Sequence, residues 1–230
     1  MGENKFTALL LVASFLIVLG VYPQSVDNDT EKTFYEKYSN WKALMASPKS
    51  KFLSDTTGVT TSSYEEIVKL GPGSLPYIFK EISADHNLWY AVRKITKKWF
   101  TKDERDKVKN EIVSLYVYWY HTGRKQTPQR FEKLYAEYKG FKSQHRDKDA
   151  QETYQKIKDL GIDALPLLAD KMSKGEEGLE DAFSYLSDEP VNKDNMDKYS
   201  KSKNRREAYV KWWQENKEKW LIKEVEEQKN

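Results

Sequence analysis

The chain has 230 residues, of which 39 are Lys or Arg and 36 are Asp or Glu, so its formal net charge is only +3. This balance excludes bulk binding of nucleic acid, which needs a dominant basic surface, and an aromatic content of 13% excludes a disordered polymer. The absence of Cys excludes disulfides, thiolate catalysis and Cys-ligated zinc.

The first 25 residues have the pattern of a targeting segment rather than of a folded domain. Lys5 precedes a run without charge from Phe6 to Tyr22, which is short for a membrane-spanning helix and long enough for the apolar core of a signal peptide. We predict a signal peptide or an uncleaved N-terminal membrane anchor in residues 1–25. The remainder is predicted to be extracytoplasmic: periplasmic, secreted, or membrane-anchored and facing outward.

Residues 26–125 show the apolar spacing of amphipathic helices and no sustained strand alternation. A helix is predicted to begin with a capping box at Ser62 and to end at Gly71. Ser74 is expected to cap the next helix, which has Pro76 in its first turn, where a missing N–H group costs nothing.

Two further helices are predicted in this part of the chain. Leu88–Trp99 has an apolar stripe at helical spacing. Thr101 and Glu104 form a second capping box, which is expected to open one long helix through Trp119. A new helix is predicted to start at Thr127, within the sequence TPQR.

Residues 126–230 repeat much of this pattern, which indicates an internal duplication. The stretch YEEIVKLGPGSLPYIF begins at Tyr64, and YQKIKDLGIDALPLLA begins at Tyr154. In the second copy Asp163 is expected to cap a helix with Pro166 in its first turn, as Ser74 and Pro76 do in the first. Two helical units, 26–125 and 126–230, are predicted to stack as a short α-solenoid, because one helical pair cannot bury its apolar face alone. Further matched pairs are Phe34 and Phe131, Tyr38 and Tyr135, Trp41 and Tyr138, and Lys42 and Lys139.

The order Leu-Gly, three residues, Leu-Pro and then an apolar helix is similar to a HEAT repeat, and the ends of the units resemble segments of bacterial HEAT-repeat proteins. The resemblance covers about 35 residues in the middle of each unit. It implies an all-α, armadillo-type fold. The units are about twice as long as an ordinary HEAT repeat, which favours a compact two-lobed solenoid over a long curved array.

No pattern in the sequence indicates catalysis or a cofactor. His86, His121 and His145 lie far apart, and neither H-E-x-x-H nor G-x-S-x-G occurs. The stretch DKDAQE at Asp147 lacks the glycine that a calcium loop has at its sixth position. We therefore predict no catalytic residue, no metal and no cofactor.

The aromatic residues leave one alternative function open. Four Trp residues lie at positions that are aromatic in both units, which packing in the core explains: Trp41, Trp119, Trp212 and Trp213. Other aromatic residues of the first unit could instead bind a glycan or, with a carboxylate pair, serve a glycan hydrolase. These are Trp89, Trp99, Tyr116, Tyr118 and Tyr120.

The charges of the two units differ. The helix predicted at Leu88–Trp99 has four basic residues and no acid, whereas the matching region 176–189 has six acidic residues and no base. A basic helix face can dock another protein or an acidic macromolecule, although a solvated face or packing against the acidic region would produce the same pattern. The predicted partner-binding residues are Tyr90, Arg93, Lys94, Lys97 and Lys98.

The sequence thus predicts an exported or membrane-tethered helical-repeat scaffold that binds another protein at the cell envelope and catalyses no reaction. Nucleic acid is not an expected partner. Contact with a membrane is expected only through residues 1–25, if they stay uncleaved.

Overall fold

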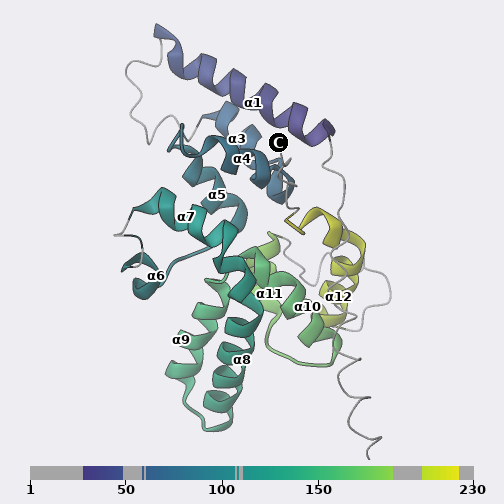
Figure 1. The fold of residues 1–230 in the computed structure, drawn as a ribbon. Helices are drawn as coiled ribbons and strands as arrows, with labels where there is room; N and C mark the ends of the chain where they lie inside the picture. Colours follow the sequence, from purple (N-terminus) through teal and green to yellow (C-terminus); the bar gives the residue numbers. More distant parts are fainter. Residues whose placement is uncertain are drawn as a thin grey trace, which may run out of the picture.

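The computed structural model of this protein contains helices and no strand in the residues that it describes (Figure 1), which confirms the predicted all-α class. Among these residues, no helix combines the length and the hydropathy that a membrane span requires. The targeting segment predicted in residues 1–25 lies outside it. The described residues are 28–48, 59, 61–106, 108, 111–188 and 204–222.

In the first half of the chain, α1 lies across α3 and α4, and α5 packs between these helices and α7 (Figure 1). The short helix α6 lies beside α7 at the edge of the molecule. The elements are α1 (Asn28–Ala46), α3 (Ser62–Val68), the 3-10 turn η2 (Gly71–Ser74), α4 (Leu75–Glu81), α5 (Leu88–Thr96), α6 (Lys102–Asp106) and α7 (Ile112–His121).

In the second half, α8 and α9 form a long antiparallel hairpin, and α10 packs against α11 and α12 (Figure 1). The turn η6 contacts η2, so the end of the described chain returns to the first half. The elements are η3 (Gly123–Gln126), α8 (Thr127–Ser143), α9 (Asp147–Lys158), η4 (Ile162–Ala164), α10 (Leu165–Ser173), α11 (Glu180–Ser187), α12 (Arg205–Asn216) and η6 (Lys217–Lys219).

Several helix starts follow the local sequence. Pro76 and Pro166 lie in the first turns of α4 and α10, as predicted. Helix α3 is capped one residue earlier than expected, because Thr61 and not Ser62 has the extended backbone of an N-cap. The hydroxyl of Thr61 accepts a hydrogen bond from the backbone N–H of Tyr64 at 3.3 Å.

The caps predicted at Ser74 and Asp163 are wrong. Each of these residues belongs to a 3-10 turn that leads directly into the following helix, so its backbone is already helical and its side chain is free for other contacts. The Ser74 hydroxyl donates to the carbonyl of Gly71 at 2.8 Å. Asp163 instead forms an ion pair with Arg124 at 3.3 Å.

The long helix predicted from Thr101 through Trp119 is also wrong, because α6 ends at Asp106 and α7 begins at Ile112. The capping box itself is present: the backbone N–H of Thr101 donates to the Glu104 carboxylate at 2.8 Å. Helix α6 has no buried side chain, so few tertiary contacts stabilise a longer helix here.

The two halves place the same interaction at matched positions. The hydroxyl of Tyr64 accepts a hydrogen bond from the backbone N–H of Ala91 at 2.9 Å, and Tyr154 accepts one from Ala182 at 2.8 Å. Tyr64 lies on α3 and binds the first turn of α5, and Tyr154 lies on α9 and binds the first turn of α11. Each tyrosine thus connects two helices through a buried polar contact.

A second interaction, an ion pair, is also matched between the two halves. Lys42 forms an ion pair with Asp85 at 3.2 Å, and Lys139 forms one with Glu176 at 2.7 Å. Lys42 and Lys139 are a matched pair in the duplicated sequence, and both carboxylates lie three residues before a matched leucine, Leu88 or Leu179. The duplicated sequence therefore repeats polar contacts as well as apolar packing.

Replacing Tyr154 with Phe is expected to lower the free energy of unfolding by about 1–3 kcal/mol, because the buried N–H group of Ala182 loses its acceptor. Tyr64→Phe is expected to cost at least as much, since Tyr64 also donates to the carbonyl of Asn87 at 2.6 Å. Urea denaturation measures both. Tyr118→Phe is the control. If neither Tyr64→Phe nor Tyr154→Phe lowers the free energy of unfolding more than Tyr118→Phe does, the two hydroxyls have no structural role.

Candidate functional site

Helix α5 buries the apolar stripe that the sequence predicts, but it ends at Thr96 rather than at Trp99. Lys97 closes the helix in the left-handed conformation, with φ 52° and ψ 19°. Residues 97–99 therefore leave the helix and do not continue its outer face.

Three of the five predicted partner-binding residues remain on the outer side of α5. Tyr90 is half-buried, and Lys94 is exposed and forms an ion pair with Glu65. The guanidinium of Arg93 lies over the indole of Trp99, 3.8 Å from the ring centroid. Such a cation–π contact orients both side chains.

The structure corrects the place of Lys98, whose side chain is only 2% exposed and does not belong to a solvent face. The turn at Lys97 directs it inward, where its ammonium donates to the Trp99 carbonyl at 2.7 Å and to Glu104 at 3.3 Å. Arg130 of α8 also donates to Glu104, at 2.5 Å. Burial lowers the pKa of Lys98.

Lys97 connects the two halves of the molecule. Its ammonium forms an ion pair with Asp188 at the end of α11 and donates to the backbone carbonyl of Tyr185 at 2.5 Å. The contacts of Lys97 therefore favour packing of the basic segment against the acidic region 176–189 over a solvated or partner-binding role. Its charge is largely compensated within the protein.

The backbone just after α5 is in direct contact with the backbone just after α9. The N–H of Trp99 donates to the carbonyl of Asp159 at 3.1 Å. Gly161 has φ +78°, and a Cβ atom there would lie 2.5 Å from the carbonyl oxygen of Thr96. We call this junction, between residues 96–100 and the ends of α9 and α11, the seam.

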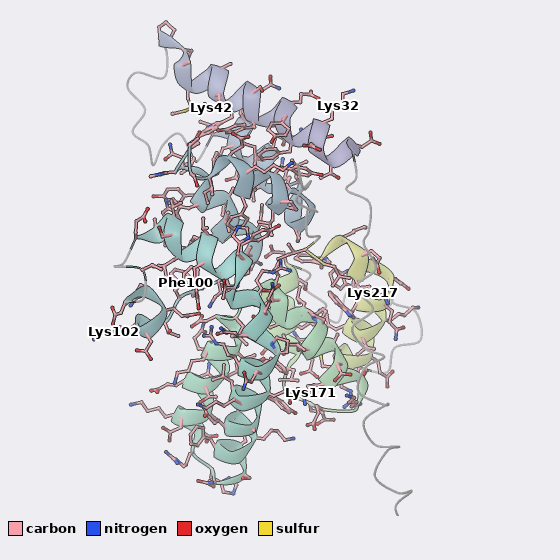
Figure 2. All side chains as sticks on the ribbon, in the orientation of Figure 1. Lys32, Lys42, Phe100, Lys102, Lys171 and Lys217 are labelled. Carbon is pink, nitrogen blue, oxygen red and sulfur yellow. The ribbon has the colours of Figure 1, made fainter. Side chains whose placement is uncertain are left out.

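Ring contacts with α7 anchor residues 98–100 of the seam. Phe100, labelled in Figure 2, lies edge to face with Tyr116 of α7 at a centroid distance of 4.8 Å. The hydroxyl of Tyr116 donates to the Lys98 carbonyl at 3.3 Å. These contacts hold residues 98–100 in place and leave the neighbouring Trp99 ring pointing outward.

Two large aromatic side chains are exposed beside the seam, Trp99 at 44% and Tyr185 at 41%. The ammonium groups of Lys158 and Lys97 lie 5.3 and 5.2 Å from the ring centroid of Tyr185, and the charge of Lys97 is already paired with Asp188. Each exposed ring therefore has a cation against it, Arg93 in one half and Lys158 in the other. We call these four residues the seam surface.

The sequence identified two members of the seam surface, Arg93 and Trp99, and missed the other two. Tyr185 occupies the position that Lys94 occupies in the first half of the duplication. An aromatic residue at a position that is charged in the other copy was the available signal. Lys158 carries no such signal, because lysines are frequent in this chain.

The five aromatic residues considered for glycan binding do not share one exposed face. Tyr116 is only 1% exposed, and Tyr120 stacks on Phe79 at a centroid distance of 4.1 Å. Trp99 is the member of this set that is exposed. The prediction that matched tryptophans belong to the core is confirmed for Trp41, Trp119, Trp212 and Trp213, which are all buried.

Two shallow, open hollows of about 420 and 430 Å³ lie elsewhere on the surface. In the described part of the chain, no cluster of three or more His, Asp or Glu residues is arranged to hold a metal ion. The first hollow is lined by Glu177, Glu180, Asn204, Arg205 and Arg206, and the second by Trp41, Lys42, Met45, Ala46, Ala84, Asp85, His86 and Asn87.

Comparison with known proteins identifies no relative: no family model, curated protein or solved structure matches this chain. The resemblance to HEAT repeats therefore stays a prediction from the sequence. The functional argument accordingly rests on the chemistry of the seam surface.

Proposed function

We propose that this protein is a HEAT-like helical scaffold of two tandem units, 26–125 and 126–230, that binds another protein without catalysis. The repeated tyrosine contacts, at Tyr64 and Tyr154, support the two-unit arrangement. Stacked helical units provide extended binding surfaces and no built-in reactive group. We place this activity at the cell envelope on the basis of the apolar segment in residues 1–25.

The observation that carries the binding function is the exposure of Trp99 and Tyr185 beside a tightly packed junction. Exposed aromatic rings beside cations are the residue types that contribute most at protein interfaces. The backbone contact at Gly161 and the ion pair of Lys97 with Asp188 hold both rings in place. Because the rings are held before a partner arrives, binding loses little conformational entropy.

A photo-crosslinking experiment tests the proposed function. The photoreactive residue p-benzoylphenylalanine replaces Trp99 or Tyr185 in the full chain, expressed in its source cells. We expect each position to form a crosslink to a discrete second protein. The control is Lys148, an exposed residue of the α8–α9 hairpin. The absence of adducts at both seam positions, or the same adducts at position 148, would contradict the proposal.

A further inference from the structure

We infer that the seam surface binds an extended acidic segment of its protein partner. Arg93 with Trp99 forms one anchor, and Lys158 with Tyr185 forms the other. This inference rests on the proposed function and specifies the chemistry of the partner.

The charges around the seam favour an acidic partner. Lys94 and Lys97 each have a carboxylate partner, Glu65 and Asp188 respectively. In the described part of the chain, Arg93 and Lys158 have no carboxylate oxygen within 4.0 Å. Two positive charges therefore stay uncompensated beside the two exposed rings.

Two acidic groups at the seam have hydrogen-bond or ion-pair partners within the protein. Asp159 accepts a hydrogen bond from the side-chain amide of Gln155 at 2.9 Å. Asp188, which is 75% exposed, is paired with Lys97. Carboxylates of a partner could thus complete the charge balance of the surface.

The geometry of Arg93 suits a carboxylate in particular. A planar guanidinium that lies over an indole ring keeps its in-plane N–H groups available at its edge. Those groups match the two oxygens of a carboxylate, while the exposed part of the Trp99 ring accommodates an apolar side chain. The anchor therefore fits a segment in which acidic and apolar residues alternate.

The two anchors belong to different halves of the molecule and meet at the end of α9. The N–H of Trp99 is bonded to the carbonyl of Asp159, and the neighbouring Lys158 reaches over Tyr185. A ligand that contacts both anchors must cross the seam. An extended segment can do so, and its binding would bridge the two halves.

The test uses the full chain and a fluorescein-labelled peptide of four Glu-Glu-Phe repeats, with four Gln-Gln-Phe repeats as the neutral counterpart. Fluorescence anisotropy measures both affinities. We expect the acidic peptide to bind about tenfold more tightly or better, which corresponds to about 1.4 kcal/mol. Its affinity should fall as salt rises from about 0.05 to 0.5 M, because the Debye length shrinks well below 10 Å.

Variants assign the binding to the seam surface. The double variant Arg93→Glu with Lys158→Glu should bind the acidic peptide about 30-fold more weakly or worse, because like charges then face each other. The double variant Trp99→Ala with Tyr185→Ala should lower the affinity for the acidic peptide about tenfold. The matched control is Lys133→Glu with Lys148→Glu on the α8–α9 hairpin, which changes the net charge equally and should stay within about twofold.

Three results would overturn the inference: equal affinity for the neutral peptide, an equal loss in the control variant, or tighter binding of a 12-residue thymidine oligonucleotide. The last would indicate a single-stranded nucleic acid as the ligand. If crosslinks form at positions 99 and 185 but the acidic peptide has no advantage, the inference fails and the proposed function stands. If the peptide binds but no crosslink forms in cells, the proposed function fails.

Discussion

Replacing Gly161 with alanine is expected to lower the free energy of unfolding by about 3 kcal/mol or more. The new Cβ atom would lie 2.5 Å from the Thr96 carbonyl oxygen and 3.1 Å from the Cα of Lys98, so two backbone segments would have to separate. The backbone at Gly161, with φ +78° and ψ −164°, lies in a region that essentially only glycine occupies, so any residue with a Cβ adds about 1–3 kcal/mol of strain. Urea denaturation of the full chain measures the loss.

Gly71 provides the matched control, because it is the counterpart of Gly161 in the duplicated sequence. Its φ angle is +66°, but no atom lies within 4 Å of the position that a Cβ would occupy. Gly71→Ala should therefore cost only about 1 kcal/mol, from backbone strain alone. Equal losses in the two variants would show that the seam contact does not contribute to stability.

The second large effect is expected from the ion network of Lys98, Glu104 and Arg130. Glu104→Ala should destabilise the protein by about 3–5 kcal/mol, because the buried Lys98 ammonium would lose its carboxylate partner. Adding Lys98→Met to this variant should recover part of the loss, since the uncompensated buried charge is removed. Without such recovery, a contribution other than charge pairing would explain the loss.

The same network predicts a dependence of stability on pH. Burial raises the pKa of Glu104, but hydrogen bonds from Arg130 and the charge of Lys98 outweigh it and lower the pKa from 4.5 to about 2. A depressed pKa in the folded state stabilises the protein above pH 4.5, and this contribution is lost as pH falls toward 2. From pH 6 to pH 3 it should decline by about 2 kcal/mol.

Glu104→Gln removes this titration, so the free energy of unfolding of that variant should fall less steeply over the same interval. Urea denaturation at several pH values measures both slopes. Glu66→Gln is the control: the Glu66 side chain is 44% exposed and paired with Lys37 and Lys69, and its removal should change stability little. Parallel slopes for the wild type and Glu104→Gln would contradict the lowered pKa.

The helical class, the helix starts at the two prolines and the burial of the four matched tryptophans could all be predicted from the amino-acid sequence. Each depends on residues within one or two turns of each other or on a pattern present in both copies. Phe34 and Phe131 show this: both are fully buried at corresponding places, because the same apolar spacing demands the same packing.

The end of α5 and the exposure of its charged side chains depend on tertiary contacts and could not be predicted from the sequence. The local pattern favours a helix that continues to Trp99. Instead, Lys97 adopts the left-handed backbone conformation, and its side chain pairs with Asp188 at the end of α11. The turn also allows the backbone of residues 96–98 to lie against Gly161. These contacts join segments that are far apart in the chain, so spacing along the sequence could not show that Lys98 is buried or that Trp99 and Tyr185 flank one seam.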